Sequence, residues 1–226
     1  MLHSIYVIDF FWHEDWYLRT IDIAHDHFGF YLAWGDSVWL PFTYTVQSQY
    51  LHHNQLNLGA EHWALNLFIF VLGLAGYAIF RGANDQKDAM RRIFSPGPAA
   101  NAEGAKQQVE LQKKTLVWGK PPTFLAAPYL TSDGKSHTSL LVTCGYWGLA
   151  RHMNYFGDIM MATAMGLATL AVPGGPGLVG WHYTLFLSTL LVHRVRGCDV
   201  RCSAKYGDTW VEYRSVVRWR IIPGIY

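Results

Sequence analysis

The sequence predicts an all-α fold, namely a polytopic bundle of transmembrane helices. Three observations lead to this class: an apolar composition, four long apolar segments, and basic residues that gather on one side of the expected bundle. Hydrophobic residues make up 51% of the 226 positions and charged residues 15%, whereas an average soluble domain carries about 25% charged residues. Ten tryptophans and thirteen tyrosines suit a chain with many anchors at membrane surfaces.

The clearest of the four segments is 62–80, which has no charged residue. As a helix it would be about 28 Å long, against a hydrocarbon core of about 30 Å. The segment 28–51 is long enough to span a bilayer but contains an aspartate, a proline and two glutamines. We therefore expect it to face a protein interior or a cavity. The segments 155–172 and 178–192 are separated by Pro-Gly-Gly-Pro-Gly, which predicts a helical hairpin.

The basic residues test this layout independently, because the cytoplasmic flanks of membrane helices collect Lys and Arg. The range 81–151 holds ten of the 18 basic residues and the range 194–220 holds seven. The connecting segments 52–61 and 173–180 hold none. The buried helices of a soluble bundle, the alternative interpretation, would not explain this one-sided charge. We expect one membrane domain over 1–226, with a cytoplasmic loop at 81–151 and a cytoplasmic carboxy terminus.

Within that loop, 95–107 is rich in Pro, Gly and Ala and is interpreted as a flexible insertion. Short β-like runs between turns in 115–143 predict an ordered loop or a small hairpin. The first 16 residues have no basic region before an apolar run that Asp9 breaks early, so no cleavable signal peptide is expected.

Cysteine usage and net charge argue against two classes of ligand, metal ions and nucleic acids. Cys144, Cys198 and Cys202 lie on the expected cytoplasmic side, so free thiols are predicted. Cys198, Cys202 and His193 lack a second pair of ligands, so we expect no metal site. A net charge of +2 without a basic arm indicates no nucleic acid partner.

The expected chemistry lies at the cytoplasmic membrane face, where three basic clusters flank the helices and form a cofactor-binding face. In the first cluster, Lys87 and Arg91 are four positions apart, so on a helix they share a face and could clamp one phosphate. Arg151 and the run 194–206 supply the other clusters. Basic helix ends are also a general property of membrane proteins. Aromatic and amide side chains between the charges favour a dinucleotide instead: Trp147, Asn154, Tyr155, Tyr206 and Tyr213.

Several blocks of the sequence resemble the sterol reductase family, which includes Δ14-reductases, Δ7-reductases and the lamin B receptor. The blocks that carry the resemblance are GYWGLARHMNYFGD at 145–158, CSAKYG at 202–207, RIIPGIY at 220–226, and two more at 25–36 and 39–47. The resemblance runs from about residue 5 to residue 226 and corresponds to the carboxy-terminal half of the family. The blocks 5–12, 83–88 and 117–121 are more similar to the Δ7-reductases.

This resemblance implies NADPH-dependent reduction of a sterol ring double bond, expected to be the Δ7 bond, with Δ14 as the alternative. It implies that Lys87 and Arg91 engage the NADPH phosphates, and a 2′-phosphate does require Lys or Arg. Trp147 is expected to stack on the cofactor and to donate its indole N–H. The other positions that match the cofactor pocket are Val142, Asn154, Tyr155, Asp199, Cys202, Ser203, Ala204, Lys205, Tyr206 and Tyr213. Where the family has R-x-x-R-D, the last two positions are Gly197 and Cys198, and Asp199 is expected to substitute.

Reduction of an electron-rich alkene needs an acid that protonates one carbon before hydride arrives. The candidates in the first 50 residues are Glu14, Asp22, Asp26, Asp36, Tyr44 and Tyr50. We favour Tyr44 and Glu14 as the catalytic residues.

Rival functions remain open from the sequence. A membrane methyltransferase of the isoprenylcysteine type has a similar hairpin but would bind S-adenosylmethionine, and a non-catalytic sterol-binding protein is another candidate. The eleven histidines form no H-x-x-H-H boxes, which argues against a di-iron desaturase. The expected partners are a sterol substrate, the lipid bilayer of the endoplasmic reticulum, and another membrane subunit that supplies the family's amino-terminal helices.

Overall fold

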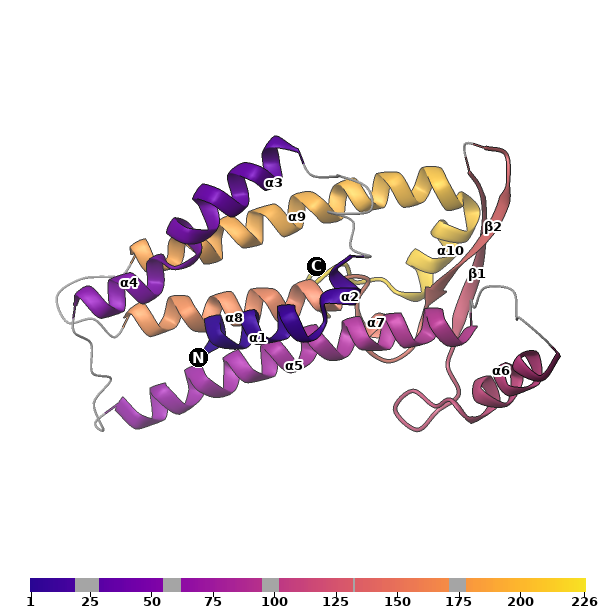
Figure 1. Cartoon of the computed structure of the whole chain (residues 1–226), viewed down its shortest axis with the longest axis horizontal. Coiled ribbons are helices and arrows are strands. Elements are labelled where there is room, and N and C mark those ends of the chain that lie inside the picture. Colours follow the sequence, from indigo (N-terminus) through magenta and orange to yellow (C-terminus); the bar gives the residue numbers. More distant parts are fainter. Residues whose placement is uncertain (19–28, 55–61, 95–101, 132, 171–177) are drawn as a thin grey trace. The chain divides into compact units, whose positions relative to one another are not determined.

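The computed structural model describes residues 1–18, 29–54, 62–94, 102–131, 133–170 and 178–226 (Figure 1). These residues are mainly helical, as predicted, with one two-stranded sheet. They form two compact units: 1–74 with 160–187, the first unit, and 75–159 with 188–226, the second unit. Three long helices, α5, α8 and α9, run through the boundaries between these ranges.

The first unit begins with α1 (Leu2–Trp12) and the short α2 (Glu14–Tyr17). The segment expected to be a single span, 28–51, instead contains α3 (Phe30–Trp34), the π-helix η2 (Gly35–Tyr44) and the start of α4 (Val46–His53). Pro41 lies inside η2 and has no N–H to donate, so the ordinary helical ladder cannot continue through it. The Thr45 hydroxyl donates to the Pro41 carbonyl at 2.7 Å.

Helix α1 packs against the end of η2 through polar contacts. His3 Nε2 lies 3.0 Å from the Tyr44 carbonyl oxygen, and His3 Nδ1 lies 2.9 Å from the Ser48 hydroxyl. The His3 ring also meets the Tyr44 ring edge-on, with centroids 4.7 Å apart. These contacts orient the backbone and the ring of Tyr44 together.

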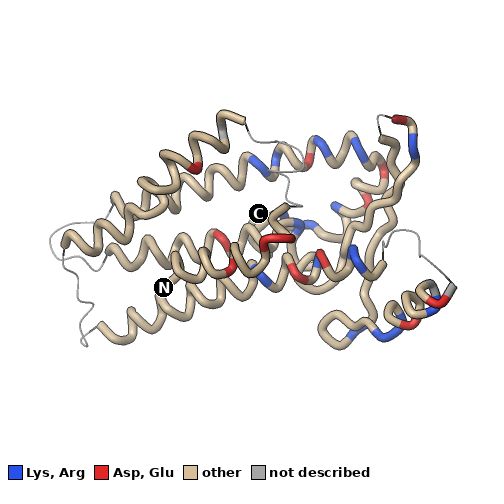
Figure 2. The backbone as a smooth tube through the Cα atoms, in the orientation of Figure 1, with Lys and Arg blue, Asp and Glu red and all other residues tan. Residues whose placement is uncertain are grey.

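Helix α5 (Trp63–Phe94) has 32 residues and is about 48 Å long. The range from Arg81 was predicted to be a cytoplasmic loop, and its first part, up to Phe94, is a continuation of this helix. Ion pairs one helical turn apart, Arg81–Asp85 at 2.9 Å and Asp88–Arg92 at 2.7 Å, support the charged half. Figure 2 shows that the charges lie in the second half of α5 and that its first half is uncharged.

Among the described helices, α5 is the one that is long and apolar enough to cross a membrane. Its length exceeds the roughly 30 Å of a hydrocarbon core, so the charged end, from Arg81 onward, would extend beyond the bilayer. The four-span layout expected from the sequence stays a prediction.

The predicted flexible insertion is partly helical, since α6 (Ala102–Lys114) begins within it, while 95–101 lies outside the described residues. The small hairpin is confirmed: β1 (Phe124–Leu130) pairs antiparallel with β2 (Ser136–Val142), from Phe124–Val142 to Leu130–Ser136. Gly134 closes the loop with a φ of 78°, a left-handed conformation that glycine adopts without strain.

The second unit also contains α7 (Tyr146–Leu149), α10 (Asp208–Val216), the first part of α8 (Met153–Leu170) and the second part of α9 (Leu178–Tyr206). Helix α9 continues well beyond the apolar segment predicted at 178–192. The turn predicted at 173–177 lies outside the described residues. Gly207, with a φ of 53°, separates α9 from α10 and lets the chain reverse.

A close approach between α5 and α8 gives a test of this packing. A Cβ atom at Gly157 would lie 2.6 Å from the Gly76 carbonyl oxygen and 2.6 Å from the Phe80 nitrogen. Gly157→Ala should therefore destabilise the protein by about 1 to 3 kcal/mol, as overpacking does. The matched control is Gly197→Ala on α9, where a Cβ meets nothing within 4 Å. Thermal unfolding in detergent measures both, and equal melting temperatures would contradict the proposed contact.

Candidate cofactor site

Lys87 and Trp147 form the centre of the candidate site, in the second unit. The Lys87 ammonium lies 4.1 Å from the centre of the Trp147 ring, a cation–π contact. Trp147 is 5% exposed and packs with Met90 and Val142. The structure therefore brings together three of the predicted residues, Lys87, Val142 and Trp147.

The indole N–H of Trp147 donates to the Ala83 carbonyl at 2.7 Å. Donation of this N–H to a cofactor stays a prediction, and in this structure a carbonyl of α5 accepts it. Ala83 is one helical turn before Lys87, so the hydrogen bond fixes the ring beneath the Lys87 ammonium. Trp147 therefore acts here as a buried support for Lys87.

Burial lowers the pKa of Lys87 to about 8, and the neighbouring positive charge of Arg91 contributes to this shift. Arg91 is exposed on the next turn of α5. In the described part of the chain, neither residue forms an ion pair with a carboxylate within 4 Å. A partly desolvated cation beside an exposed cation is an arrangement that an anionic ligand would stabilise.

Two asparagines of the second unit, one of them on α5 a turn before Lys87, have polar atoms to spare. Asn154 Nδ2 donates to Asn84 Oδ1 at 3.3 Å. Asn154 Oδ1 and Asn84 Nδ2 are buried and find no hydrogen-bond partner within the described residues. One acceptor and one donor side by side match the needs of a primary amide. Tyr155, the next predicted residue, stacks on His152 with centroids 5.0 Å apart.

Cys198 and Cys202 lie one turn apart on α9, with their sulfur atoms 3.7 Å apart. Both are free thiols, as is Cys144, which confirms the prediction. A hydrogen bond from Cys202 lowers the pKa of Cys198, with smaller contributions from His152 and Lys87. The same hydrogen bond raises the pKa of Cys202. No group of three metal-binding side chains occurs among the residues that the structure describes.

The carboxy-terminal wall predicted from the family is only partly assembled. Cys202 and Tyr213 pack with Trp210 and Val217 in one cluster, and burial raises the pKa of Tyr213. Tyr206 also packs against this cluster, whereas three other predicted residues are exposed. Ser203 and Ala204 are exposed, the Lys205 ammonium lies 3.7 Å from the centre of the Tyr129 ring on β1, and Tyr206 meets Tyr129 edge-on.

Asp199 forms a link between two arginines. Its Oδ2 accepts from Arg220 Nε at 3.1 Å and lies 3.6 Å from an Arg151 nitrogen. The carboxylate therefore ties α9 to the carboxy-terminal segment.

The candidate proton donors lie in the first unit. Tyr44 is partly buried among three rings, those of His3, Tyr6 and Tyr183. Glu14 is exposed at the start of α2. Of the other candidates, Asp36 is exposed, Tyr50 is partly buried, and Asp22 and Asp26 lie outside the described residues.

Residues 1–226 match the model of the "Ergosterol biosynthesis ERG4/ERG24 family". The chain belongs to the ERG4/ERG24 family. The resemblance to sterol reductases predicted from the sequence is thereby confirmed.

Individual relatives in the ERG4/ERG24 family carry two different names. The chain is 46% identical to the 7-dehydrocholesterol reductase of Danio rerio over 226 residues, all of this chain and 42% of that protein. It is 44% identical to the Delta(14)-sterol reductase of Methylotuvimicrobium alcaliphilum over 223 residues, 99% of this chain and 44% of that protein. The Delta(14)-sterol reductase of Arabidopsis thaliana is 36% identical over 223 residues, 99% of this chain and 50% of that protein. The chain thus spans about half the length of these relatives or less.

Three features of this ERG4/ERG24 chain were missed from the sequence. Asp9 on α1 is 4% exposed and lies beside His13 at 3.2 Å, and its place inside an apolar run was the available signal. Asn84 was missed because its partner Asn154 is 70 positions away. A pocket lined by arginines near the carboxy terminus was also missed, although the excess of basic residues in 194–220 was counted.

Cys198 provides a test of the electrostatics of this site. Because Cys202 stabilises the Cys198 thiolate, Cys198 should react with iodoacetamide at pH 6.5. This pH lies well below the ordinary pKa of a thiol, which is about 8.5. Cys202→Ala removes the hydrogen-bond donor and should slow this alkylation several-fold. Mass spectrometry of the modified peptide measures the rate, with Cys144 as the internal reference. An unchanged pH profile in Cys202→Ala would contradict the assigned hydrogen bond.

Proposed function

We propose that this chain is the cofactor-binding part of an NADPH-dependent reductase that saturates a ring double bond of a sterol, the Δ7 bond being the expected one. The observation that carries this proposal is the family match over all 226 residues. Because the chain spans less than half of the 7-dehydrocholesterol reductase that it resembles, we propose that it works with a further membrane segment or subunit.

The residues present suit NADPH. Lys87 and Arg91 would hold a phosphate, since neither is neutralised by a carboxylate in the described part of the chain. The spare acceptor of Asn154 and the spare donor of Asn84 would hold the carboxamide of the nicotinamide. When bound, NADPH supplies the hydride. Trp147 keeps Lys87 in place, and its burial excludes water from one side of the ammonium.

The proton needed for the reduction is proposed to come from the first unit, from Tyr44, with Glu14 as the second candidate. The His3 ring donates from Nε2 to the Tyr44 carbonyl and contacts the Tyr44 ring, so Tyr44 is positioned more tightly than the exposed Glu14. A positioned acid typically contributes about 100-fold to 10,000-fold in rate.

Reduction of the Δ14 bond is the second candidate, because identity to a Delta(14)-sterol reductase is nearly as high, 44% against 46%. The sterol profile of cells deficient in Δ7-reductase and expressing this chain, alone or with the amino-terminal half of a relative, tests both. Loss of Δ5,7-sterols supports the Δ7 assignment. Loss of Δ14-sterols in the matching deficient strain supports the alternative. An unchanged profile in every combination would overturn the reductase proposal.

The Lys87 and Arg91 pair yields a prediction about the cofactor. Lys87→Glu and Arg91→Glu should each weaken NADPH binding much more than NADH binding, because the reversed charge repels the additional phosphate. Arg92→Glu on the same helix is the control, since Arg92 is already paired with Asp88. Equal losses for both nucleotides would mean that the pair is structural.

The same pair predicts a dependence on pH. With a Lys87 pKa of about 8, the charged fraction falls about tenfold between pH 7 and pH 9, and NADPH affinity should fall with it. Lys87→Arg stays charged over this range and should remove the dependence. Fluorescence titration of the purified protein measures both affinities, and a parallel decline in Lys87→Arg would contradict the assignment.

We also propose that the chain is a multi-pass protein of the endoplasmic reticulum membrane with a cytoplasmic carboxy terminus. The distribution of basic residues and the length of α5 support this topology. A glycosylation tag inserted at 174 should be modified and a tag after 226 should not, and the reverse pattern would refute the orientation.

A further inference from the structure

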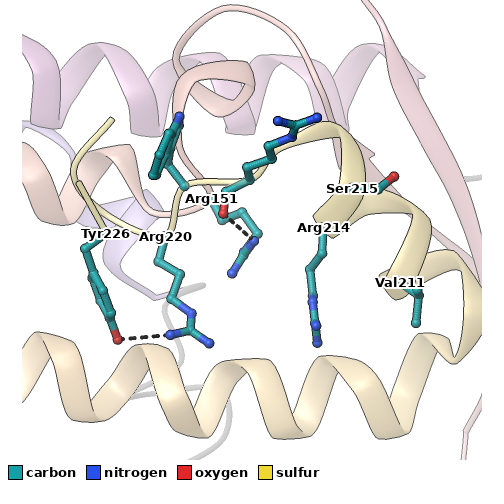
Figure 3. Close-up of a pocket in the computed structure, with 8 residues that line it drawn as sticks. Arg151, Val211, Arg214, Ser215, Arg220 and Tyr226 are labelled. Carbon is teal, nitrogen blue, oxygen red and sulfur yellow. Dashed lines mark hydrogen bonds between the residues drawn. The ribbon is translucent and has the colours of Figure 1, made fainter. Parts of the chain in front are cut away.

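A basic pocket in the second unit lies outside the candidate cofactor site. It has a volume of about 530 Å³ and is formed by α10, the segment that follows it, and the turn before α8 (Figure 3). The lining residues are Arg151, Val211, Arg214, Ser215, Arg218, Trp219, Arg220 and Tyr226. Half of these eight residues are arginines, and Lys87 and Arg91 are not among them.

One wall of the pocket is rigid. Arg151 is 5% exposed and donates to the carbonyl oxygens of Val217 at 2.9 Å and Arg218 at 3.2 Å. Its backbone N–H donates to the Trp219 carbonyl at 2.9 Å. Arg220 is held by Asp199 and donates to the Tyr226 hydroxyl at 3.5 Å. The segment that carries Arg218, Trp219 and Arg220 is therefore fixed before any ligand binds.

The charges in the pocket are only partly balanced. Arg151 and Arg220 share the single negative charge of Asp199, which therefore offsets only one of their two positive charges. Arg214 and Arg218 are exposed, and neither pairs with a carboxylate within the described residues. The Nε of Arg151 is buried and has no hydrogen-bond partner in the described part of the chain. Figure 3 shows Arg151, Arg214 and Arg220 projecting to the same side of the carboxy-terminal segment.

The chemistry of these groups selects a particular kind of anion. Guanidinium groups bind phosphate oxygens through paired N–H donors. A bare phosphate would leave most of the volume empty, and the pocket lies in the range of about 300 to 1,000 Å³ typical of small-molecule sites. Val211 and Trp219 give it an apolar wall beside the cations. We infer that this pocket binds a phosphate ester, separately from the cofactor phosphate at Lys87 and Arg91.

Two sources of a phosphate ester can be distinguished with the full chain in uncharged detergent. The soluble probe is sn-glycerol 3-phosphate, titrated at constant ionic strength. The membrane probe is a vesicle of phosphatidylglycerol in phosphatidylcholine, compared with phosphatidylcholine alone. Binding of the soluble probe identifies a free ester as sufficient, whereas binding confined to the phosphatidylglycerol vesicles identifies a lipid headgroup. Either result supports the pocket if substitution of the pocket arginines weakens the binding of that probe.

In the double variant Arg214→Gln/Arg218→Gln, the affinity for the probe that binds the parent protein should fall by about tenfold for each arginine removed, as expected for lost charge-assisted hydrogen bonds. Arg196→Gln/Arg201→Gln removes the same charge from exposed positions of α9 and should change affinity less than about twofold. Arg214→Lys/Arg218→Lys should give an intermediate loss, because it keeps the charge without the paired donors.

Three results would overturn the inference. The first is that neither probe binds, and the second is that the pocket variant and the α9 control lose equal affinity. The third is that Lys87→Gln abolishes binding of the probe while the pocket variant does not. The third result would assign the phosphate to the cofactor site. Titration of the pocket variant with NADPH tests the proposed function separately, so a failure of this inference can be told apart from a failure of that function.

Discussion

The second unit depends on the buried guanidinium of Arg151. This one side chain donates to two carbonyl oxygens in the segment after α10 and lies 3.6 Å from Asp199 on α9. The backbone of Arg151 and His152 adds two more hydrogen bonds, to Trp219 and Arg220. A charge buried to this degree is costly unless it is paired and hydrogen-bonded. Removing any of its partners would leave that cost uncompensated, so α8, α9 and the carboxy-terminal segment must stay together.

A second constraint acts around Lys87, where an aromatic ring and a thiol meet the ammonium. The Trp147 ring supports the ammonium from one side, and Cys198 is close enough for each group to influence the other's ionisation. Burial works against the charged lysine, whereas the nearby thiolate favours it. An anionic ligand at Lys87 would favour the charged lysine further and compete with the thiolate. The ionisation of Lys87 therefore depends on the charges around it more strongly than the ionisation of a fully solvated lysine would.

The candidate groups are divided between the two compact units. The cations, amides and thiols that suit a dinucleotide belong to the second unit, and the candidate acids belong to the first. Ring packing in the first unit centres on Tyr44, while the second unit contains two cationic sites, Lys87 with Arg91 and the arginine pocket. The helices α5, α8 and α9 belong to both units and connect them covalently.

The sequence by itself determined the properties that depend on local pattern. Apolar runs marked parts of α5, α8 and α9, the alternation of β-like runs and turns marked the hairpin, and the motif blocks identified the family. Local pattern could not give the helix ends, because the continuation of α5 is charged and carries ion pairs one turn apart, such as Arg81–Asp85, where an apolar run would have been recognised.

Only the tertiary structure decided which polar groups are already engaged. The Trp147 N–H is used by Ala83, 64 positions away, and Arg151 is used by Val217, 66 positions away. Such pairs leave no periodic signal along the chain, because neither partner needs a fixed sequence neighbour. The arginine pocket arises in the same way: its cations come from both sides of α9 in the sequence, and one rigid segment brings them together.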